Sequence, residues 1–205
     1  MQYIELREQL KNYPIFNPTD IRKLEADFDL RRLNEWQKKK YIRKVRKGYY
    51  LFSDTEVNDR TLYLIANRMY EPSYVSLEMA LSIYGLIPEA VYGVTSITSQ
   101  NTKTWKTPVG DFIYRHVRPD LMFGSELREY EGHHYQVAEI EKAVLDYLYL
   151  NSRFKSEEDF KGLRFNVIEF KEKANMEKFN KYLAAFQNKA LEKRVKKFLA
   201  YINNN

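Results

Sequence analysis

The sequence of 205 residues contains no cysteine and only three histidines, His116, His133 and His134. Without cysteine the chain can form neither a disulfide nor a thiolate metal site. The histidines follow no HExxH or zinc-type spacing, and an adjacent pair beside Gly132 is more typical of a turn than of metal ligands. We therefore expect neither a metal nor a cofactor.

Motifs of the common enzyme classes are also missing. The chain has no P-loop, no GxGxxG after a predicted strand and no GxSxG. The carboxylates of Asp111, Glu126 and Asp146 could meet in space, but no spacing distinguishes them. We therefore expect no catalytic residues and a protein that is not an enzyme. A nuclease built from acidic side chains and lysine stays open as an alternative.

Long hydrophobic runs are absent as well. The first ten residues carry charges every few positions, unlike a signal peptide, and the longest apolar stretches are too short for a membrane span. The 44% of hydrophobic and 15% of aromatic residues are typical of a folded protein. We expect a cytoplasmic protein with no membrane partner, comprising one large domain or two small ones.

The positive charge lies at the two ends of the chain. The net charge is +6 overall, and it is +4 in residues 1–60, −4 in residues 61–170 and +6 in residues 171–205. This asymmetry favours a nucleic-acid-binding module joined to a body with another role. A solvated basic surface without a ligand is the alternative.

The most basic stretch runs from Asp29 to Phe52, with nine basic and two acidic side chains and a net charge of +7. Its first half has the spacing of a helix that Asp29 can cap, with Leu30, Leu33 and Trp36 as the apolar positions. From Tyr41 the pattern alternates as in a strand. Lys47-Gly48 predicts a turn, and the residues that follow predict a short return strand.

Two further helices are predicted before this stretch, over residues 2–12 and after a cap at Asn17 or Thr19. Three helices and a hairpin within residues 1–55 are typical of a winged helix-turn-helix domain. Its third helix would read base edges and its hairpin would hold phosphates. The predicted DNA-binding residues are Arg31, Arg32, Asn34, Lys38, Lys39, Arg43, Lys44, Arg46 and Lys47. A small α+β core with an exposed basic rim is the alternative.

Residues 53–58 are polar and mark a boundary, after which residues 56–205 predict an α+β domain. Helices are predicted over 57–69, 75–84 and 138–149, and strands over 92–98, 112–117 and a short hairpin at 130–137. These strands indicate a small antiparallel sheet, and residues 156–202 predict C-terminal helices. The lysines from Lys178 to Lys197 form either a solvated helix face or a second DNA contact.

Four segments together resemble the AbiEi family, the antitoxins and transcriptional regulators of type IV toxin–antitoxin systems in bacterial phage defence. They read RKVRKGYYLF, SYVSLEMALSIYGLIPE, YGVTSITSQNTKTWKTPVGDFIYRHV and YQVAEIEKAVLDYLYL. The resemblance extends from Ile21 to Asn151. The sequence departs from the family at Ala138 to Glu141, where relatives start the helix with alanine, serine and proline.

The resemblance implies a repressor that binds double-stranded DNA at inverted repeats in its own promoter and thereby regulates its operon. It also implies a C-terminal domain that counteracts a cognate nucleotidyltransferase-like toxin from a neighbouring gene, without a stable complex. Members of the family are not enzymes. A stand-alone regulator, or a protein-interaction module without a toxin partner, is the alternative.

Overall fold

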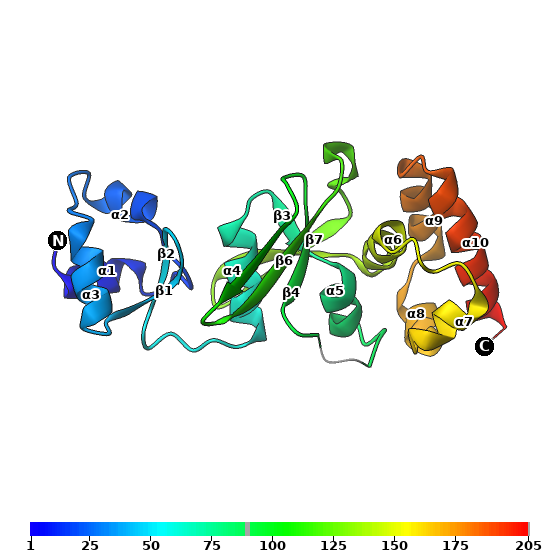
Figure 1. The fold of residues 1–205 in the computed structure, drawn as a ribbon, viewed down its shortest axis with the longest axis horizontal. Coiled ribbons are helices and arrows are strands. Elements are labelled where there is room, and N and C mark those ends of the chain that lie inside the picture. Colours follow the sequence, from blue (N-terminus) through cyan, green and yellow to red (C-terminus); the bar gives the residue numbers. More distant parts are fainter. Residues whose placement is uncertain (89–90, 205) are drawn as a thin grey trace.

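The computed structural model describes residues 1–88 and 91–204, and the molecule is elongated (Figure 1). Three parts follow one another along its longest axis. They are an N-terminal part (residues 1–55), a sheet part (residues 56–150) and a group of C-terminal helices (residues 151–204). The protein is thus α+β, as the sequence predicts.

The N-terminal part contains three helices and a two-stranded antiparallel hairpin: α1 (Tyr3–Leu10), α2 (Pro18–Leu24), α3 (Arg31–Lys38), β1 (Ile42–Arg46) and β2 (Tyr49–Phe52). This element order agrees with the prediction. The Asn17 side chain caps α2 by accepting hydrogen bonds from the backbone N–H groups of Thr19 and Asp20, at 2.7 and 3.0 Å. Gly48 has a φ of +80° in the hairpin turn, which glycine adopts without steric cost.

These elements enclose a small apolar core. Trp36 of α3 packs on Phe28 with 5.6 Å between the ring centroids, and Phe16 packs on Phe52 of β2 at 4.8 Å. The buried members of this core are Leu6, Leu10, Phe16, Ile21, Phe28, Leu33, Trp36, Ile42, Tyr50 and Phe52. Because α3 and the hairpin share this core, their exposed faces keep a fixed relation to each other.

The sheet part is built on six strands: β3 (Ser73–Val75), β4 (Val94–Thr98), β5 (Lys103–Thr107), β6 (Gly110–His116), β7 (Ser125–Tyr130) and β8 (His133–Ala138). Their order across the sheet is β5-β6-β4-β3-β8-β7. The turn and the second strand of the hairpin predicted at 130–137 agree with the structure, but the hairpin of β7 and β8 is longer than predicted. Its six-residue strands pair antiparallel along their whole length.

The prediction of a small antiparallel sheet is wrong in size and in type. The sheet is mixed, since β3 pairs in parallel with β8 and β4 pairs in parallel with β6. Helical spacing assigns Val75 to a helix, whereas in the structure it ends β3. The polar segment Lys103–Thr107 forms β5, the antiparallel partner of β6. A fully buried strand of three residues and a polar edge strand both lack the alternation by which strands are recognised.

Seven α-helices complete the described part of the chain: α4 (Asp59–Met69), α5 (Leu77–Ile83), α6 (Ile140–Leu150), α7 (Glu157–Gly162), α8 (Val167–Lys173), α9 (Met176–Ala185) and α10 (Lys189–Asn203). Pro119–Leu121 forms a short 3-10 helix. All residues of α6 from Ile140 to Leu148 are buried, because this helix lies between the sheet and the C-terminal helices (Figure 1). Within the described residues, no helix combines the length and the apolar character needed to cross a membrane.

The N-terminal part packs directly on the sheet part. Ile15, Val45 and Leu51 belong to the same apolar cluster as the core of the sheet part. The contact is reinforced by an ion pair in which the Arg68 guanidinium of α4 donates to the buried Asp20 carboxylate at 2.6 Å. The position of α3 and β1 relative to the sheet is therefore fixed by both apolar and charged contacts.

His133 lies at this junction, and its protonation should report on the contact. Its ring centroid is 5.7 Å from that of Tyr13, and burial lowers the pKa of His133 below its ordinary value of 6.5. We expect an NMR titration to give a midpoint below 6.5, and the Tyr13→Ala variant to return it toward 6.5. Because folding disfavours the charged imidazole, stability is intact above pH 6.5 and decreases as the pH falls toward the lowered pKa.

The control for this titration is Tyr92→Ala, because the Tyr92 side chain is 92% exposed and belongs to another region of the chain. This substitution should leave the midpoint of His133 unchanged. A midpoint at or above 6.5 in the unmodified protein would contradict the packing at the junction.

Candidate nucleic-acid interface

The exposed face of α3 carries charged and polar side chains at helical spacing. Leu33 and Trp36 are buried, and Arg31, Asn34 and Lys38 are exposed. In Figure 1, α3 lies at the end of the molecule opposite the C-terminal helices. The helix therefore presents Arg31, Asn34 and Lys38 to solvent at one tip of the protein.

Arg31 is exposed but paired. Its guanidinium lies 2.9 Å from the Asp29 carboxylate, which also accepts a hydrogen bond from the Arg31 backbone N–H at 3.0 Å. The hydrogen bond from the Arg31 side chain lowers the pKa of Asp29, and the same bond raises the pKa of Arg31. Because an exposed pair of this kind contributes little to stability, Arg31 can exchange Asp29 for another anion at small cost.

Arg32 makes contacts within the N-terminal part. Its guanidinium lies 5.5 Å from the centre of the Trp36 ring and donates a hydrogen bond to Gln2 Oε1 at 3.0 Å. These contacts tie the start of α3 to the start of α1. Arg32 is half-buried, so the structure does not bring it fully onto the exposed face.

Two arginines of β1 are likewise engaged within the protein. Arg43 donates to the backbone carbonyl oxygen of Thr55 at 2.9 Å while remaining exposed. The half-buried Arg46 faces the sheet part, where its guanidinium lies 3.7 Å from the ring centre of Trp105 and 5.2 Å from that of Tyr49. The structure therefore places Arg46 at the junction of the two parts, apart from the exposed basic residues.

The remaining predicted residues form the exposed basic surface. Lys38, Lys39, Lys44 and Lys47 are all exposed and make no ion pair within residues 1–88 and 91–204. A shallow groove of about 420 Å³ lies between the end of α3 and β1, lined by Gln37, Lys40, Ile42, Arg43, Lys44 and Ser53. We call the exposed Asn34, Lys38, Lys39, Lys44 and Lys47 the α3–β1 face. The lysine ammonium groups of this face can bind a polyanion, and the Asn34 side-chain amide can form hydrogen bonds with a base edge.

A buried charged cluster in the sheet part was not recognised from the sequence as a unit. Lys142 and Asp146, one turn apart on α6, are both fully buried. The Asp146 carboxylate accepts hydrogen bonds from the Lys142 ammonium and from the hydroxyls of Tyr74 and Ser76, the latter two at 2.9 Å. Lys142 also donates to Tyr74 Oη at 2.8 Å. The spacing of four residues within an apolar helix was the available signal.

Burial governs the electrostatics of this cluster. It lowers the pKa of Lys142 and raises the pKa of Asp146, while each charge acts on the other in the opposite direction. The rings of Phe123 and Phe186, each 4.9 Å from the ammonium, close the cluster on the side of the C-terminal helices. The cluster joins β3, α6 and the end of α9. Because no face of the cluster reaches solvent, we assign it a structural role as a tie between these elements.

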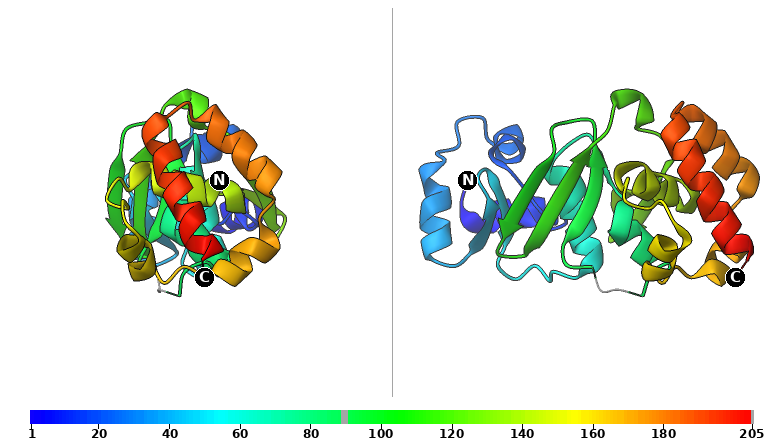
Figure 2. Two further views of the ribbon diagram at one scale, coloured as in Figure 1. Left: turned by 90° about the vertical axis from the view of Figure 1, so that its right-hand side faces the viewer. Right: turned by 45° about the vertical axis from the view of Figure 1, so that its right-hand side comes forward.

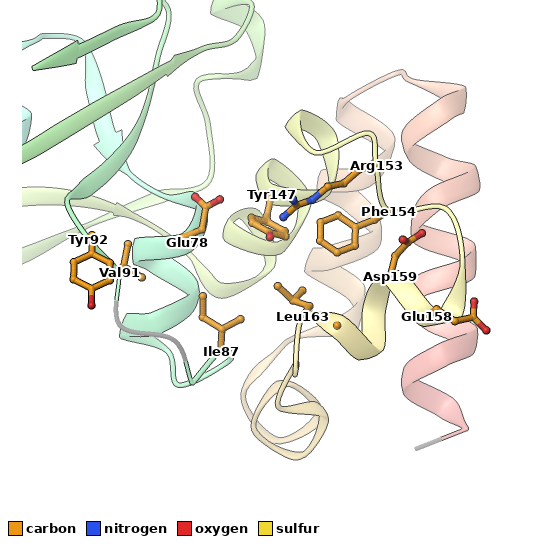
Figure 3. A pocket seen from close by; sticks show the side chains of 11 residues that line it. Glu78, Ile87, Val91, Tyr92, Tyr147, Arg153, Phe154, Glu158, Asp159 and Leu163 are labelled. Carbon is orange, nitrogen blue, oxygen red and sulfur yellow. The ribbon is translucent and has the colours of Figure 1, made fainter.

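A cleft of about 770 Å³ opens between α5, α6 and α7, on the far side of the sheet part from α3 (Figure 3). Ile87, Tyr147 and Phe154 supply apolar surface to its lining, and Arg153 extends toward Tyr147 (Figure 3). The carboxylates of Glu78, Glu158 and Asp159 belong to its lining. This volume lies within the range of sites for small organic molecules, and the lining mixes apolar and charged side chains.

Within residues 1–88 and 91–204, no group of three or more histidine and acidic side chains is arranged to hold a metal ion. The Nδ1–H group of His116 donates to the Gln100 carbonyl oxygen, 2.9 Å away, and His133 lies at the junction with Tyr13.

Neither comparison with known proteins identifies the chain: no family model matches it, and no curated protein matches it.

Proposed function

We propose that the protein is a sequence-specific DNA-binding repressor whose N-terminal part is a winged helix-turn-helix. The observation that carries this proposal is the α3–β1 face, with lysines that make no ion pair within the described residues. In a winged helix the third helix enters the major groove and the hairpin contacts the flanking backbone. The order of elements in the N-terminal part and its net basic charge are both compatible with this docking.

Within this proposal the residues divide into three roles. Asn34 is suited to an adenine edge, and Arg31 is suited to a guanine edge after leaving Asp29. Lys38, Lys39 and Lys44 hold phosphates, which fix the register of the protein on the duplex. Arg32 and Arg46, which the sequence predicts to contact DNA, instead position other elements of the N-terminal part. The first orients α3 and the second orients the hairpin.

We further propose that the repressor is the antitoxin of a type IV toxin–antitoxin system, which regulates its own operon and counteracts a nucleotidyltransferase-like toxin. The resemblance of the segments between Ile21 and Asn151 to the AbiEi family supports this. A nucleotidyltransferase gene immediately beside the gene for this protein is the observation that would test it most directly.

The DNA-binding proposal is tested with a duplex from the region upstream of the protein's own gene. Fluorescence anisotropy should show binding to this duplex that exceeds binding to a shuffled duplex of equal length and composition. The logarithm of the affinity should fall linearly with the logarithm of salt concentration, with a slope of about −0.9 per phosphate contacted. Equal affinity for the two duplexes would reject sequence-specific binding, and no binding to either would reject the interface.

The cleft between α5, α6 and α7 favours a second candidate, in which the sheet part serves to bind another molecule and the protein acts without a toxin. This candidate is a stand-alone regulator or an interaction module. Association with a neighbouring gene product that survives nuclease treatment, together with a function independent of the α3–β1 face, would distinguish it from the repressor.

A further inference from the structure

The outer face of α10 is a second basic surface. Successive residues of an α-helix are turned by about 100°. On this basis Lys189, Lys193, Lys196 and Lys197 fall within an arc of about 100°, directly opposite the buried positions Leu191, Val195, Phe198 and Ile202. All four lysines are exposed. The helix therefore presents a continuous row of lysines, which we call the stripe, to solvent on the side opposite its buried face.

Several other basic residues of the C-terminal helices are engaged within the protein, unlike most of the stripe. Lys178 lies 3.2 Å from the Glu139 carboxylate, and Arg194 donates to the Leu148 carbonyl oxygen at 2.6 Å. Lys197, at the edge of the stripe, donates to the Lys155 carbonyl oxygen at 2.7 Å. Within residues 1–88 and 91–204, Lys189, Lys193 and Lys196 make no ion pair. Their ammonium groups are therefore available to a ligand, and Glu192 is the acidic residue of the same helix beside them.

The stripe lies at the opposite end of the molecule from the α3–β1 face. In Figure 1 the two surfaces occupy the two ends of the longest axis, and in the end-on view of Figure 2, α10 lies in front of the rest of the chain. One straight duplex lying across the tip at α3 would leave α10 uncovered. A ligand of the stripe is therefore a separate molecule or a separate segment.

The chemistry of the stripe fits a nucleic-acid backbone. Lys189 to Lys197 span about 12 Å along the helix axis at 1.5 Å per residue, and one DNA strand presents a phosphate every 3.4 Å or so of its axis. The stripe can therefore meet about three phosphates. It offers no arginine, asparagine or glutamine for a base edge, and none of the large exposed apolar side chains in the described residues lies on α10 for insertion into a membrane.

We propose that α10 is a second, sequence-independent nucleic-acid contact, and that one molecule can hold two DNA segments, one at each end. The binding at α10 stands on the stripe alone, whereas the bridging of two segments rests on the proposed function of the α3–β1 face. Such a protein would bring two repeats of an operator, or an operator and a distant segment, to the two ends of one chain.

A two-duplex capture assay with the intact protein tests this. A biotinylated duplex from the upstream region is immobilised, the protein is added, and retention of a second, fluorescent duplex of unrelated sequence is measured. The variant Lys189→Gln, Lys193→Gln, Lys196→Gln should lose most of the capture while it binds the first duplex as the unmodified protein does. The salt slope for the unrelated duplex should fall by about 3. The control Lys103→Gln, Lys106→Gln, Lys171→Gln removes the same charge from other exposed sites and should retain capture.

The outcomes separate this inference from the proposed function. If the α3–β1 face is inactive, the first duplex is not bound specifically, but a salt-sensitive affinity that depends on the α10 lysines persists and supports the second contact. Capture that is unchanged in the α10 variant would overturn the inference, as would an equal loss of capture in the control variant. If the α10 variant loses binding to vesicles rich in phosphatidylserine but binds DNA as the unmodified protein does, the stripe contacts a lipid surface. That result would also overturn the inference.

Discussion

Replacing Lys38, Lys39 and Lys44 together by glutamine should lower the affinity for the upstream duplex on the order of 100-fold at 0.15 M salt. Each lysine that neutralises a phosphate contributes about 0.9 to the salt slope, and three such contacts account for about two orders of magnitude at this ionic strength. The side chains are exposed, so the fold should be unaffected. Fluorescence anisotropy over a series of salt concentrations gives both the affinity and the slope.

The matched control removes three exposed lysines elsewhere, with Lys103→Gln, Lys106→Gln and Lys171→Gln. It lowers the net charge by the same amount and should change the affinity for a single upstream duplex by only a few-fold, through the long-range field. A control that weakens binding as strongly as the triple variant of the α3–β1 face would contradict the assignment of that face.

The variant Lys142→Met should lower the free energy of unfolding by about 3–5 kcal/mol, because it leaves the fully buried Asp146 carboxylate without its counter-ion. The hydroxyls of Tyr74 and Ser76 would still donate to it, but they carry no charge. Urea-induced unfolding at pH 7, followed by circular dichroism, gives the loss. The affinity of the folded variant for DNA should be unchanged, since the cluster lies in the sheet part.

The double variant Lys142→Met, Asp146→Leu provides the matched comparison. Replacing both charges by apolar side chains of similar size removes the unpaired carboxylate, and such replacements are often neutral or stabilising. We expect the double variant to recover most of the stability lost in Lys142→Met. A single variant that loses less than about 1 kcal/mol would show that the cluster is not a structural tie.

The N-terminal part could be predicted from the sequence because its signals are local. Asn17 caps α2 through neighbouring backbone groups, and Gly48 supplies the turn conformation within the hairpin itself. The change from helical to alternating spacing near Tyr41 marks the end of α3. Each of these features depends on residues within one or two turns of chain, so no knowledge of the tertiary structure is needed.

The sheet part could be predicted only for its longer elements. Pairing of β4 with β6 in parallel, and the insertion of β3 between β4 and β8, are set by contacts between residues far apart in the chain. Local spacing cannot reveal such contacts, and for Val75 it indicates the wrong element. Ser76 falls inside the helix predicted over 75–84 but precedes α5 in the structure, where its hydroxyl donates to Asp146 and gives the helix no side-chain cap.

The candidate site shows the same division. Lysines on the exposed face of α3 follow from helical spacing around Leu33 and Trp36. The place of Arg46 does not, because it depends on Trp105, a residue of the distant β5. The burial of Lys142 could not be predicted for a related reason. A lysine in an amphipathic helix is expected to be exposed, and its burial depends on the neighbouring strand and helices.

The shared packing of Ile15, Val45 and Leu51 with the sheet part has a consequence for how the protein loses its structure. These side chains pack in the core of the sheet part, whereas the hairpin that carries Val45 and Leu51 also contributes to the separate core of the N-terminal part. Separating the N-terminal part would expose apolar surface on both sides of the junction. The two parts are therefore thermodynamically coupled, so that a ligand that binds only the folded N-terminal part would raise the melting temperature of the whole chain through mass action.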